Sequence, residues 1–260
     1  MSRIASVFSR KEHKALIAFV TVGYPSVEAT LKVVPLLSRA GCDIVELGIP
    51  FSDPLADGAT IQKASYRALQ NGITLKTCMN VAAELSGTAR IPLVFMGYYN
   101  TMLNYGLEEL CESCHESNVD GLIIPDLPPE EGGELAGFLR CKSLDLIYML
   151  TPASNQARIK LVAEKSTGFI YLVSVTGVTG ARTNLPNELE GFVSRVKQVA
   201  SQPVCVGFGI STAEQAKRVA GTADGVIVGS RIIQLMEEDS SMQKVSGFVS
   251  ELRKALDERE

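Results

Sequence analysis

The sequence predicts a (β/α)8 or TIM barrel, built as one domain over residues 1–260. Eight short apolar runs alternate with helical patterns along the chain, and no linker or low-complexity segment divides it. The runs are almost continuously apolar, as strands of a parallel sheet covered by helices are. The length of 260 residues is also typical of this barrel. The same pattern leaves a doubly wound open sheet as the alternative.

The expected strands are named by the residues at which their apolar runs begin. They begin near Ala15, Asp43, Pro92, Asp120, Leu144, Gly168, Pro203 and Asp224. Helical spacing separates them, for example over Leu107–Ser117 and Thr212–Ala220. Short amphipathic helices are expected at both ends of the chain. Their apolar residues are Ile4, Val7 and Phe8 at the start, and Val245, Phe248, Val249, Leu252 and Leu256 at the end.

The spacing between strands predicts where the longer loops lie. The two widest spacings follow strands two and six, so extended loops are expected there. In barrels of this kind, the loops at the carboxyl ends of the strands carry the chemistry. A faint repeat is also present, because strands four and eight begin with Asp-Gly and strands three and seven with proline. Matches four strands apart suit a barrel of two similar halves.

Composition and charge argue against several classes of partner. Hydrophobic residues make up 46% of the chain and charged residues 21%, which suits a globular protein with a large core. The net charge of −4 argues against a nucleic-acid or anionic-membrane surface. No apolar run approaches the ~20 residues of a membrane span, and the amino terminus lacks the apolar core of a signal peptide. We therefore expect a cytoplasmic protein whose six cysteines are reduced.

One cysteine pattern matches a haem-attachment motif. Cys111, Cys114 and His115 form the sequence C-x-x-C-H. The two cysteines continue an apolar helical stripe that includes Leu107 and Leu110, however, and cysteine packs well as a small buried hydrophobe. The chain contains only two histidines, so it offers few candidate residues for a histidine-based metal site or a Ser-His-Asp triad. We expect buried thiols and no metal.

A carboxylate interrupts the second expected strand. Side chains alternate along a strand, so Ile44, Glu46 and Gly48 share one side of a segment that otherwise consists of core residues. A buried charge without a partner costs several kcal/mol. Glu46 is therefore expected either to pair with a lysine or arginine, or to be retained for its reactivity. The loop that follows, Phe51–Gly58, carries two further acids.

Glycine-rich loops follow the last three strands. After strand six, Gly177 and Gly180 permit backbone angles that other residues resist, which suits either a mobile lid or an ordinary solvated loop. Strands seven and eight are followed by Gly207–Thr212 and Gly229–Arg231, and each segment leads into a helix. Backbone N–H groups at a helix N-terminus bind phosphate, and these two loops form the recurrent phosphate site of the barrel. Together they predict phosphate binding.

Five motifs carry a family resemblance. They are Glu46-Leu-Gly-Ile-Pro-Phe-Ser-Asp-Pro-Leu-Ala-Asp57-Gly, Gly97-Tyr-Tyr-Asn100, Pro125-Asp126-Leu-Pro-Pro-Glu-Glu, Gly177-Val-Thr-Gly180 and Gly207-Phe-Gly-Ile-Ser211. In this order they resemble the tryptophan synthase alpha chain family over essentially the whole chain. The resemblance implies a lyase that cleaves indole-3-glycerol phosphate to indole and glyceraldehyde 3-phosphate, and passes indole to a beta subunit. It implies no cofactor in this chain, because pyridoxal phosphate belongs to the beta subunit.

The resemblance also assigns roles by position. Glu46 matches the family's acid–base residue, and Asp57 matches the partner of the indole nitrogen. Residues around the substrate and its phosphate are matched by Phe19, Tyr98 and Tyr171 for the substrate, and by Gly180, Phe208, Gly209, Gly229 and Ser230 for the phosphate. The expected lid contains Gly177, Thr179 and Gly180. The expected contact with a beta subunit, in an α2β2 heterotetramer, is the surface loop with Asp53, Pro54 and Leu55.

Two residues depart from the family pattern. Ala59 and Thr101 stand where proline is common in the family, and either change could loosen a loop near the site or the partner surface. Neither removes a catalytic group. Two alternatives therefore stay open: a weakly catalytic or non-catalytic activator of the beta subunit, and another phosphate-sugar lyase or isomerase on the same barrel. Burial of Glu46 is further expected to raise its pKa.

Overall fold

Parallel strands form the centre of the molecule in a computed structural model that describes residues 1–173, 185–207 and 209–258. The strands are β1 (Ala15–Thr21), β2 (Ile44–Gly48), β3 (Leu93–Met96), β4 (Gly121–Ile123), β5 (Asp145–Ile147), β6 (Met149–Leu150), β7 (Ile170–Val173), β8 (Val204–Gly207) and β9 (Gly225–Val228). Apart from β6, each begins within two residues of an expected start. The fifth expected strand is divided at Tyr148 into β5 and β6.

The order of the strands shows that the sheet closes into a barrel. Hydrogen bonding runs in the order β5-β4-β3-β2-β1-β9-β8-β7-β6, and all of the pairs are parallel. Because β5 and β6 are two parts of one expected strand, the two ends of this order meet. The predicted barrel is confirmed, and the open sheet is wrong.

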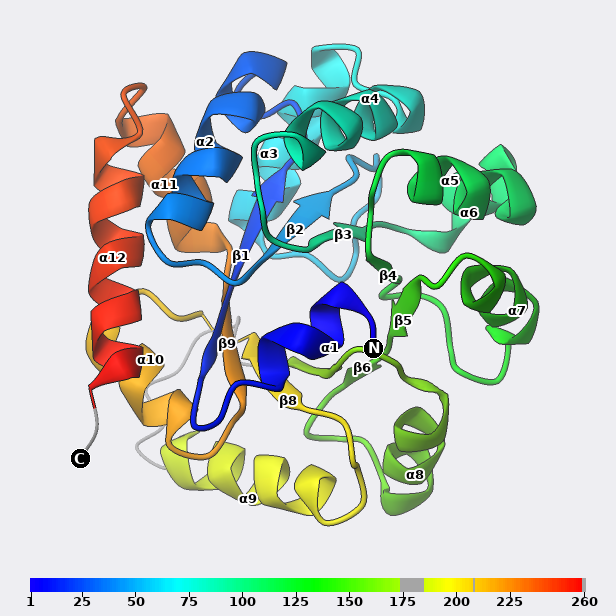
Figure 1. The fold of residues 1–260 in the computed structure, drawn as a ribbon, viewed down its shortest axis with the longest axis vertical. Coiled ribbons are helices and arrows are strands. Elements are labelled where there is room, and N and C mark those ends of the chain that lie inside the picture. Colours follow the sequence, from blue (N-terminus) through cyan, green and yellow to red (C-terminus); the bar gives the residue numbers. More distant parts are fainter. Residues whose placement is uncertain (174–184, 208, 259–260) are drawn as a thin grey trace.

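Helices surround the barrel on all sides (Figure 1). They are α1 (Arg3–Phe8), α2 (Val27–Arg39), α3 (Ala59–Gln70), α4 (Leu75–Ser86), α5 (Tyr99–Tyr105), α6 (Leu107–Glu116), α7 (Gly133–Cys141), α8 (Gln156–Lys165), α9 (Leu185–Lys197), α10 (Ala213–Ala220), α11 (Ser230–Glu238) and α12 (Gln243–Asp257). The wide spacing after β2 contains both α3 and α4, so less of it is loop than its length suggests. Most of the expected loop after β7 lies outside the described residues.

Two separate layers of apolar side chains hold this arrangement together. The larger layer lies between the strands and the surrounding helices, and it includes Cys111 and Cys114 as their helical spacing predicts. The smaller layer fills the barrel interior; its buried members are Ile4, Val7, Ala15, Ile17, Ile44, Val94, Ile123, Ile147, Phe169, Cys205 and Ile227. Because Ile4 and Val7 belong to this inner layer, α1 closes the amino end of the barrel, across which it lies in Figure 1.

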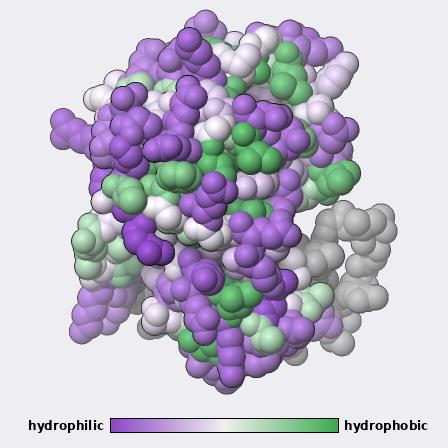
Figure 2. All heavy atoms as spheres, turned by 90° about the vertical axis from the view of Figure 1, so that its right-hand side faces the viewer, coloured by the Kyte–Doolittle hydropathy of each residue, from purple (hydrophilic) through white to green (hydrophobic). Residues whose placement is uncertain are grey.

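The outer faces of the helices are mainly polar. Figure 2 views the side of the molecule that carries α5 to α8, where hydrophilic surface predominates and hydrophobic areas are small and separated. This is the surface that amphipathic helices leave exposed when their apolar stripes pack on a barrel. Within the described ranges, no helix combines the length and apolarity needed to cross a bilayer.

A side-chain acceptor precedes every second strand of the barrel. It receives a hydrogen bond, 2.8–2.9 Å long, from a backbone N–H at the start of the strand before it. The donor and acceptor pairs are Leu16 and Asp43, Leu93 and Asp120, Leu146 and Thr167, and Val204 and Asp224. The structure thus explains the Asp-Gly match of strands four and eight, because both aspartates perform this bond.

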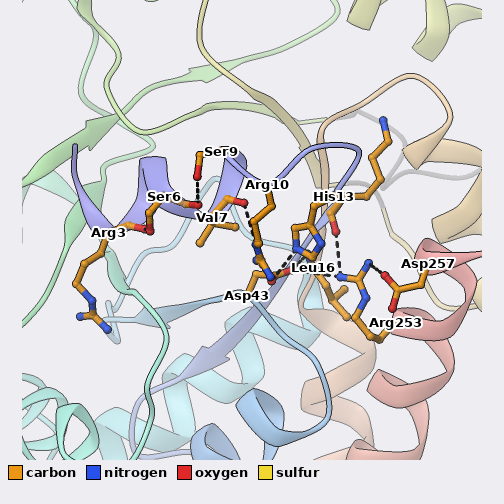
Figure 3. A network of polar contacts seen from close by, with 11 residues as sticks. Arg3, Ser6, Val7, Ser9, Arg10, His13, Leu16, Asp43, Arg253 and Asp257 are labelled. Carbon is orange, nitrogen blue, oxygen red and sulfur yellow. Dashed lines mark hydrogen bonds and ion pairs between the residues drawn. The ribbon is translucent and has the colours of Figure 1, made fainter.

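Asp43 connects the amino end of the barrel to both termini of the chain (Figure 3). Its carboxylate is 7% exposed and forms ion pairs with Arg10, which follows α1, and with Arg253 of α12 at 3.2 Å. The His13 ring nitrogen lies 2.8 Å from the same carboxylate. Arg253 also donates to Asp257 at 2.6 Å, one turn further along α12. Asp43 therefore joins the first strands to the last helix.

We expect Asp43→Asn to destabilise the chain by ~3 kcal/mol, because it leaves a group of cations at the barrel end without their shared buried anion. The measurement is the free energy of urea unfolding at pH 7. The matched control is Asp257→Asn, which contacts the same Arg253 guanidinium but is 57% exposed, so it should cost under ~1 kcal/mol. Equal losses in the two variants would contradict the role given to Asp43.

Candidate active site

Glu46 points into the barrel from the middle of β2. It is paired in register with Phe19 of β1 and with Val94 of β3. Its side chain is fully buried, and neither carboxyl oxygen has a hydrogen-bond partner among the residues that the structure describes. The alternative of a partner lysine or arginine is therefore not found in this part of the chain. Burial raises the pKa of Glu46 from 4.5 to about 8, as expected for a carboxyl without a compensating donor.

Asp57 lies in the loop between β2 and α3, and a tyrosine holds its carboxylate. The Tyr98 hydroxyl donates to Asp57 Oδ2 at 3.2 Å, and it accepts from the Ala56 backbone N–H at 2.9 Å. The Tyr98 ring stacks on Phe51 with centroids 4.9 Å apart. Burial raises the pKa of Asp57 to about 6, and the hydrogen bond from Tyr98 opposes that rise. The two predicted carboxyls thus occupy different environments.

Two aromatic side chains flank these carboxyls inside the barrel. A Cβ atom added at Gly48 would lie 2.5 Å from the Phe19 ring, and one added at Gly207 would lie 2.3 Å from the Tyr171 hydroxyl. Both glycines are therefore needed for the rings to occupy these places. The pKa of Tyr171 is raised by burial and then by the negative charges of Glu46 and Asp57. Tyr171 consequently lies within electrostatic reach of both acids.

A small cavity at the carboxyl end of the barrel is lined by Phe19, Asp57 and Tyr98, but not by Glu46 or Tyr171. Its lining residues are Phe19, Thr21, Gly48, Ile49, Asp57, Ile61, Ser65, Met96, Gly97 and Tyr98. Larger hollows lie between α2, α3 and α11, and at the amino end of the barrel beneath α1. The small cavity is the one that contains Asp57 and the neighbours of Glu46, and it lies where barrels carry their chemistry.

The predicted phosphate residues lie on adjacent loops of the same end. β8 and β9 are neighbours in the sheet, and they lead to Gly209 before α10 and to Gly229 and Ser230 at the start of α11. Gly209 has a φ of +41°, which glycine adopts readily. The N-terminus of α11 has no side-chain cap, so its first N–H groups are open to a ligand. Phe208 lies outside the described residues, as do Gly177, Thr179 and Gly180 of the expected lid.

The loop expected to contact a partner is only partly at the surface. Leu55 is 92% exposed and Asp53 is exposed, but Pro54 is buried. The expectation that Pro54 lies at the surface is wrong, because its carbonyl accepts the Asp57 N–H at 3.0 Å in a turn that takes its ring inward. Of the three residues expected at this contact, Leu55 and Asp53 are the exposed ones.

One residue of the cavity was missed from the sequence. Thr21 ends β1 and points into the barrel two positions after Phe19, and its side chain is almost fully buried. A polar residue in period-two spacing with Phe19 and Ile17, on an otherwise apolar strand, was the available signal.

The comparisons with known proteins show which family the chain belongs to. The family model described as tryptophan synthase alpha chain matches residues 6–257. The chain belongs to the tryptophan synthase alpha chain family. It is 57% identical to the tryptophan synthase alpha chain of Dehalococcoides mccartyi, covering 99% of this chain and 100% of the relative. It is 46% identical to that of Geobacter sulfurreducens, covering 98% and 99% respectively. A tryptophan synthase structure from Mycobacterium tuberculosis matches with a TM-score of 0.92 and 34% identity over 99% of both chains.

Membership of the family establishes the activity. Tryptophan synthase alpha chains are lyases that cleave indole-3-glycerol phosphate to indole and glyceraldehyde 3-phosphate, and they work with a beta subunit. The alternative of another phosphate-sugar lyase or isomerase is therefore set aside.

We expect Glu46→Gln to gain stability relative to the parent as pH rises. The folded-state pKa of Glu46 lies above its ordinary value of 4.5, so ionisation of the unfolded chain costs the parent stability between pH 4.5 and about 8. Over this pH range, the free energy of unfolding of the variant should rise by ~4 kcal/mol relative to that of the parent. Urea unfolding at pH 5 and pH 9 measures it, with Glu251→Gln on the exposed side of α12 as control. A pH-independent difference would contradict the burial of an unpaired carboxyl.

Proposed function

We propose that Glu46 and Asp57 together carry the cleavage of indole-3-glycerol phosphate in this chain. The observation that supports this assignment is the contrast between two carboxyls at one end of the barrel. Glu46, with a pKa of about 8, is largely protonated at neutral pH, whereas Asp57, with a pKa of about 6, is largely ionised. Pairs of acids whose pKa values are set apart by their surroundings are typical of acid–base catalysis.

Glu46 acts as the proton donor and then as the acceptor. The bond to be broken joins C3 of indole to the first carbon of the glycerol chain. Protonation of C3 by Glu46 gives a cation whose charge is shared with the ring nitrogen. When the bond breaks, its electron pair returns to the ring, and the first glycerol hydroxyl loses its proton to Glu46 as it becomes the aldehyde. No step requires a cofactor bound to this chain.

Asp57 stabilises the charge that develops during this step. As an ionised carboxylate beside the ring N–H, it lowers the energy of the protonated indole more than that of the neutral substrate. Tyr98 fixes the carboxylate from one side. The rings of Phe19 and Tyr171 occupy the barrel interior next to the acids, where they contact the indole.

The phosphate lies over the ends of β8 and β9. Gly229 and Ser230 offer backbone N–H groups at the start of α11, whose uncapped N-terminus favours an anion, and Gly209 offers its N–H from the neighbouring loop before α10. Gly180 and Phe208 complete this set by family position. Binding of the phosphate then favours closure of the lid that contains Gly177, Thr179 and Gly180.

The beta subunit contacts the carboxyl end of the barrel through Leu55 and Asp53, in an α2β2 heterotetramer. Leu55 is a large apolar side chain held almost entirely in water, two residues before Asp57. Direct transfer of indole between the two sites prevents its escape, since indole is small, apolar and uncharged. Pyridoxal phosphate belongs to the partner. A low rate of cleavage, with the chain acting mainly as an activator of the beta subunit, remains the alternative. Ala59 and Thr101 lie in the first turns of α3 and α5 rather than in loops, but they are close in the chain to Asp57 and Tyr98.

We expect Glu46→Gln to lower the cleavage rate by ~10²–10⁴, because the amide keeps the size of the side chain but cannot exchange a proton. The measurement is indole release from indole-3-glycerol phosphate, with and without a beta subunit. Retained binding of glycerol 3-phosphate serves as the control for an intact site. A rate within about threefold of the parent would reject Glu46 as the acid–base group, and an inactive parent that still stimulates the beta subunit would favour the activator.

We expect Leu55→Ala to weaken association with a beta subunit by about tenfold, as truncation of a buried interface anchor does. The same variant should reduce the stimulation of cleavage by the beta subunit at a fixed concentration. Tyr66→Ala is the matched control, because Tyr66 is also a large exposed side chain (65%) but lies on α3 rather than on this loop. Sedimentation of mixtures measures association; an unchanged affinity for Leu55→Ala would place the contact elsewhere.

A further inference from the structure

The Thr21 hydroxyl is a buried polar group that the mechanism above does not use. Thr21 is 2% exposed, and its Oγ1 has no hydrogen-bond partner within the described part of the chain. A buried hydroxyl is normally bonded, because leaving it unpaired forfeits its bond to water without replacement. Thr21 is also one of the residues that line the small cavity containing Asp57. Its missing partner is therefore expected to be a molecule bound in that cavity.

The strand order places Thr21 between the two ends of the substrate. β1 lies between β9, which leads to the phosphate loop at Gly229, and β2, which carries Glu46 and leads to Asp57. Thr21 is paired in register with Gly48, one inward-facing position nearer the barrel mouth than the pair of Phe19 and Glu46. A substrate with its phosphate over β8 and β9 and its ring nitrogen at Asp57 must cross the end of β1 with its glycerol chain.

The glycerol chain of the substrate has two free hydroxyls, and the mechanism proposed above uses only one of them. The first hydroxyl, on the carbon joined to indole, gives its proton to Glu46. The middle hydroxyl, on the next carbon toward the phosphate, is left without an assigned protein group. We propose that the Thr21 hydroxyl binds this middle hydroxyl. The inference rests on the function proposed above, because it uses the positions given there to the phosphate and the indole nitrogen.

This hydrogen bond makes Thr21 a specificity-determining residue. It selects substrates and products that carry a hydroxyl next to the phosphate-bearing carbon, as glyceraldehyde 3-phosphate does. It also sets the rotation of the glycerol chain, so that the first hydroxyl faces Glu46 rather than the solvent. An apolar side chain of similar shape would fill the same space without making this selection.

The test compares two ligands that differ only in the middle hydroxyl: glycerol 3-phosphate and 3-hydroxypropyl phosphate. Their affinities are measured by calorimetry for the parent, for Thr21→Val and for Thr21→Ser. The parent should prefer glycerol 3-phosphate by about tenfold, the value expected for one hydrogen bond. Thr21→Val should lose that preference by binding glycerol 3-phosphate about tenfold more weakly, with 3-hydroxypropyl phosphate unchanged. Thr21→Ser, which keeps the hydroxyl, should retain the preference.

Thermal unfolding separates this role from a structural one. Because Thr21→Val removes a hydroxyl that no described residue of the chain pairs with, the unfolding temperature of this variant should equal or exceed that of the parent. A preference that survives in Thr21→Val, an equal loss of both ligands, or a marked drop in its unfolding temperature would each overturn the proposal. If Thr21→Val does not fold, the parent and Thr21→Ser are compared instead. A preference for glycerol 3-phosphate in both supports the proposal, and the lack of this preference in either one overturns it.

The same titrations distinguish failure of this inference from failure of the proposed function. A parent chain that binds both phosphate esters equally would overturn the role of Thr21 alone. A parent chain that binds neither ester, with or without a beta subunit, would overturn the phosphate site and the Thr21 inference with it.

Discussion

The unpaired carboxyl of Glu46 inside the barrel is the constraint on which the rest of the structure depends. No described residue donates a hydrogen bond to it, so the fold tolerates a group whose charged form is strongly disfavoured in that place. Other interactions offset the free-energy cost of burying Glu46: the apolar inner layer, and the ion pairs around Asp43 at the opposite end of the barrel. Stability and chemistry are thus separated along the barrel axis, as is usual for this fold.

The second carboxyl shows how the same fold produces the opposite protonation state. Asp57 is also largely withdrawn from water, but it receives a hydrogen bond from Tyr98, which is itself fixed by the Ala56 N–H and by stacking on Phe51. A donor to the ionised form lowers the pKa of a carboxyl, and a missing donor leaves burial unopposed. The hydrogen bond from Tyr98 therefore helps to keep the pKa of Asp57 below that of Glu46, which has no such donor among the described residues.

Much of this arrangement could be predicted from the sequence, because parallel strands are continuous apolar runs and Glu46 interrupts one of them. The division of the fifth expected strand at Tyr148 could not be predicted. It involves a hydrogen bond from the Tyr148 N–H to the hydroxyl of Ser166, which lies 18 residues further along the chain. The burial of Pro54 depends on a turn closed by Asp57. Thr21 was missed because a lone threonine on a strand is common. It is distinguished by a buried hydroxyl for which the described part of the chain offers no hydrogen-bond partner.

The exposure of Leu55 and the position of Asp57 are linked by the shortness of the loop that carries both. The turn between the Pro54 carbonyl and the Asp57 N–H spans Leu55, so a surface that captures Leu55 also acts on the backbone that holds the Asp57 carboxylate against Tyr98. A partner shifts such an equilibrium only as far as it prefers one arrangement of the loop over another. In the function proposed above, the same carboxylate stabilises the charged indole, so a preference of the partner for one loop arrangement acts directly on the energy of the chemical step. Coupling between subunit contact and catalysis therefore needs no relay through the barrel core, and a loop of a few residues is sufficient to provide it.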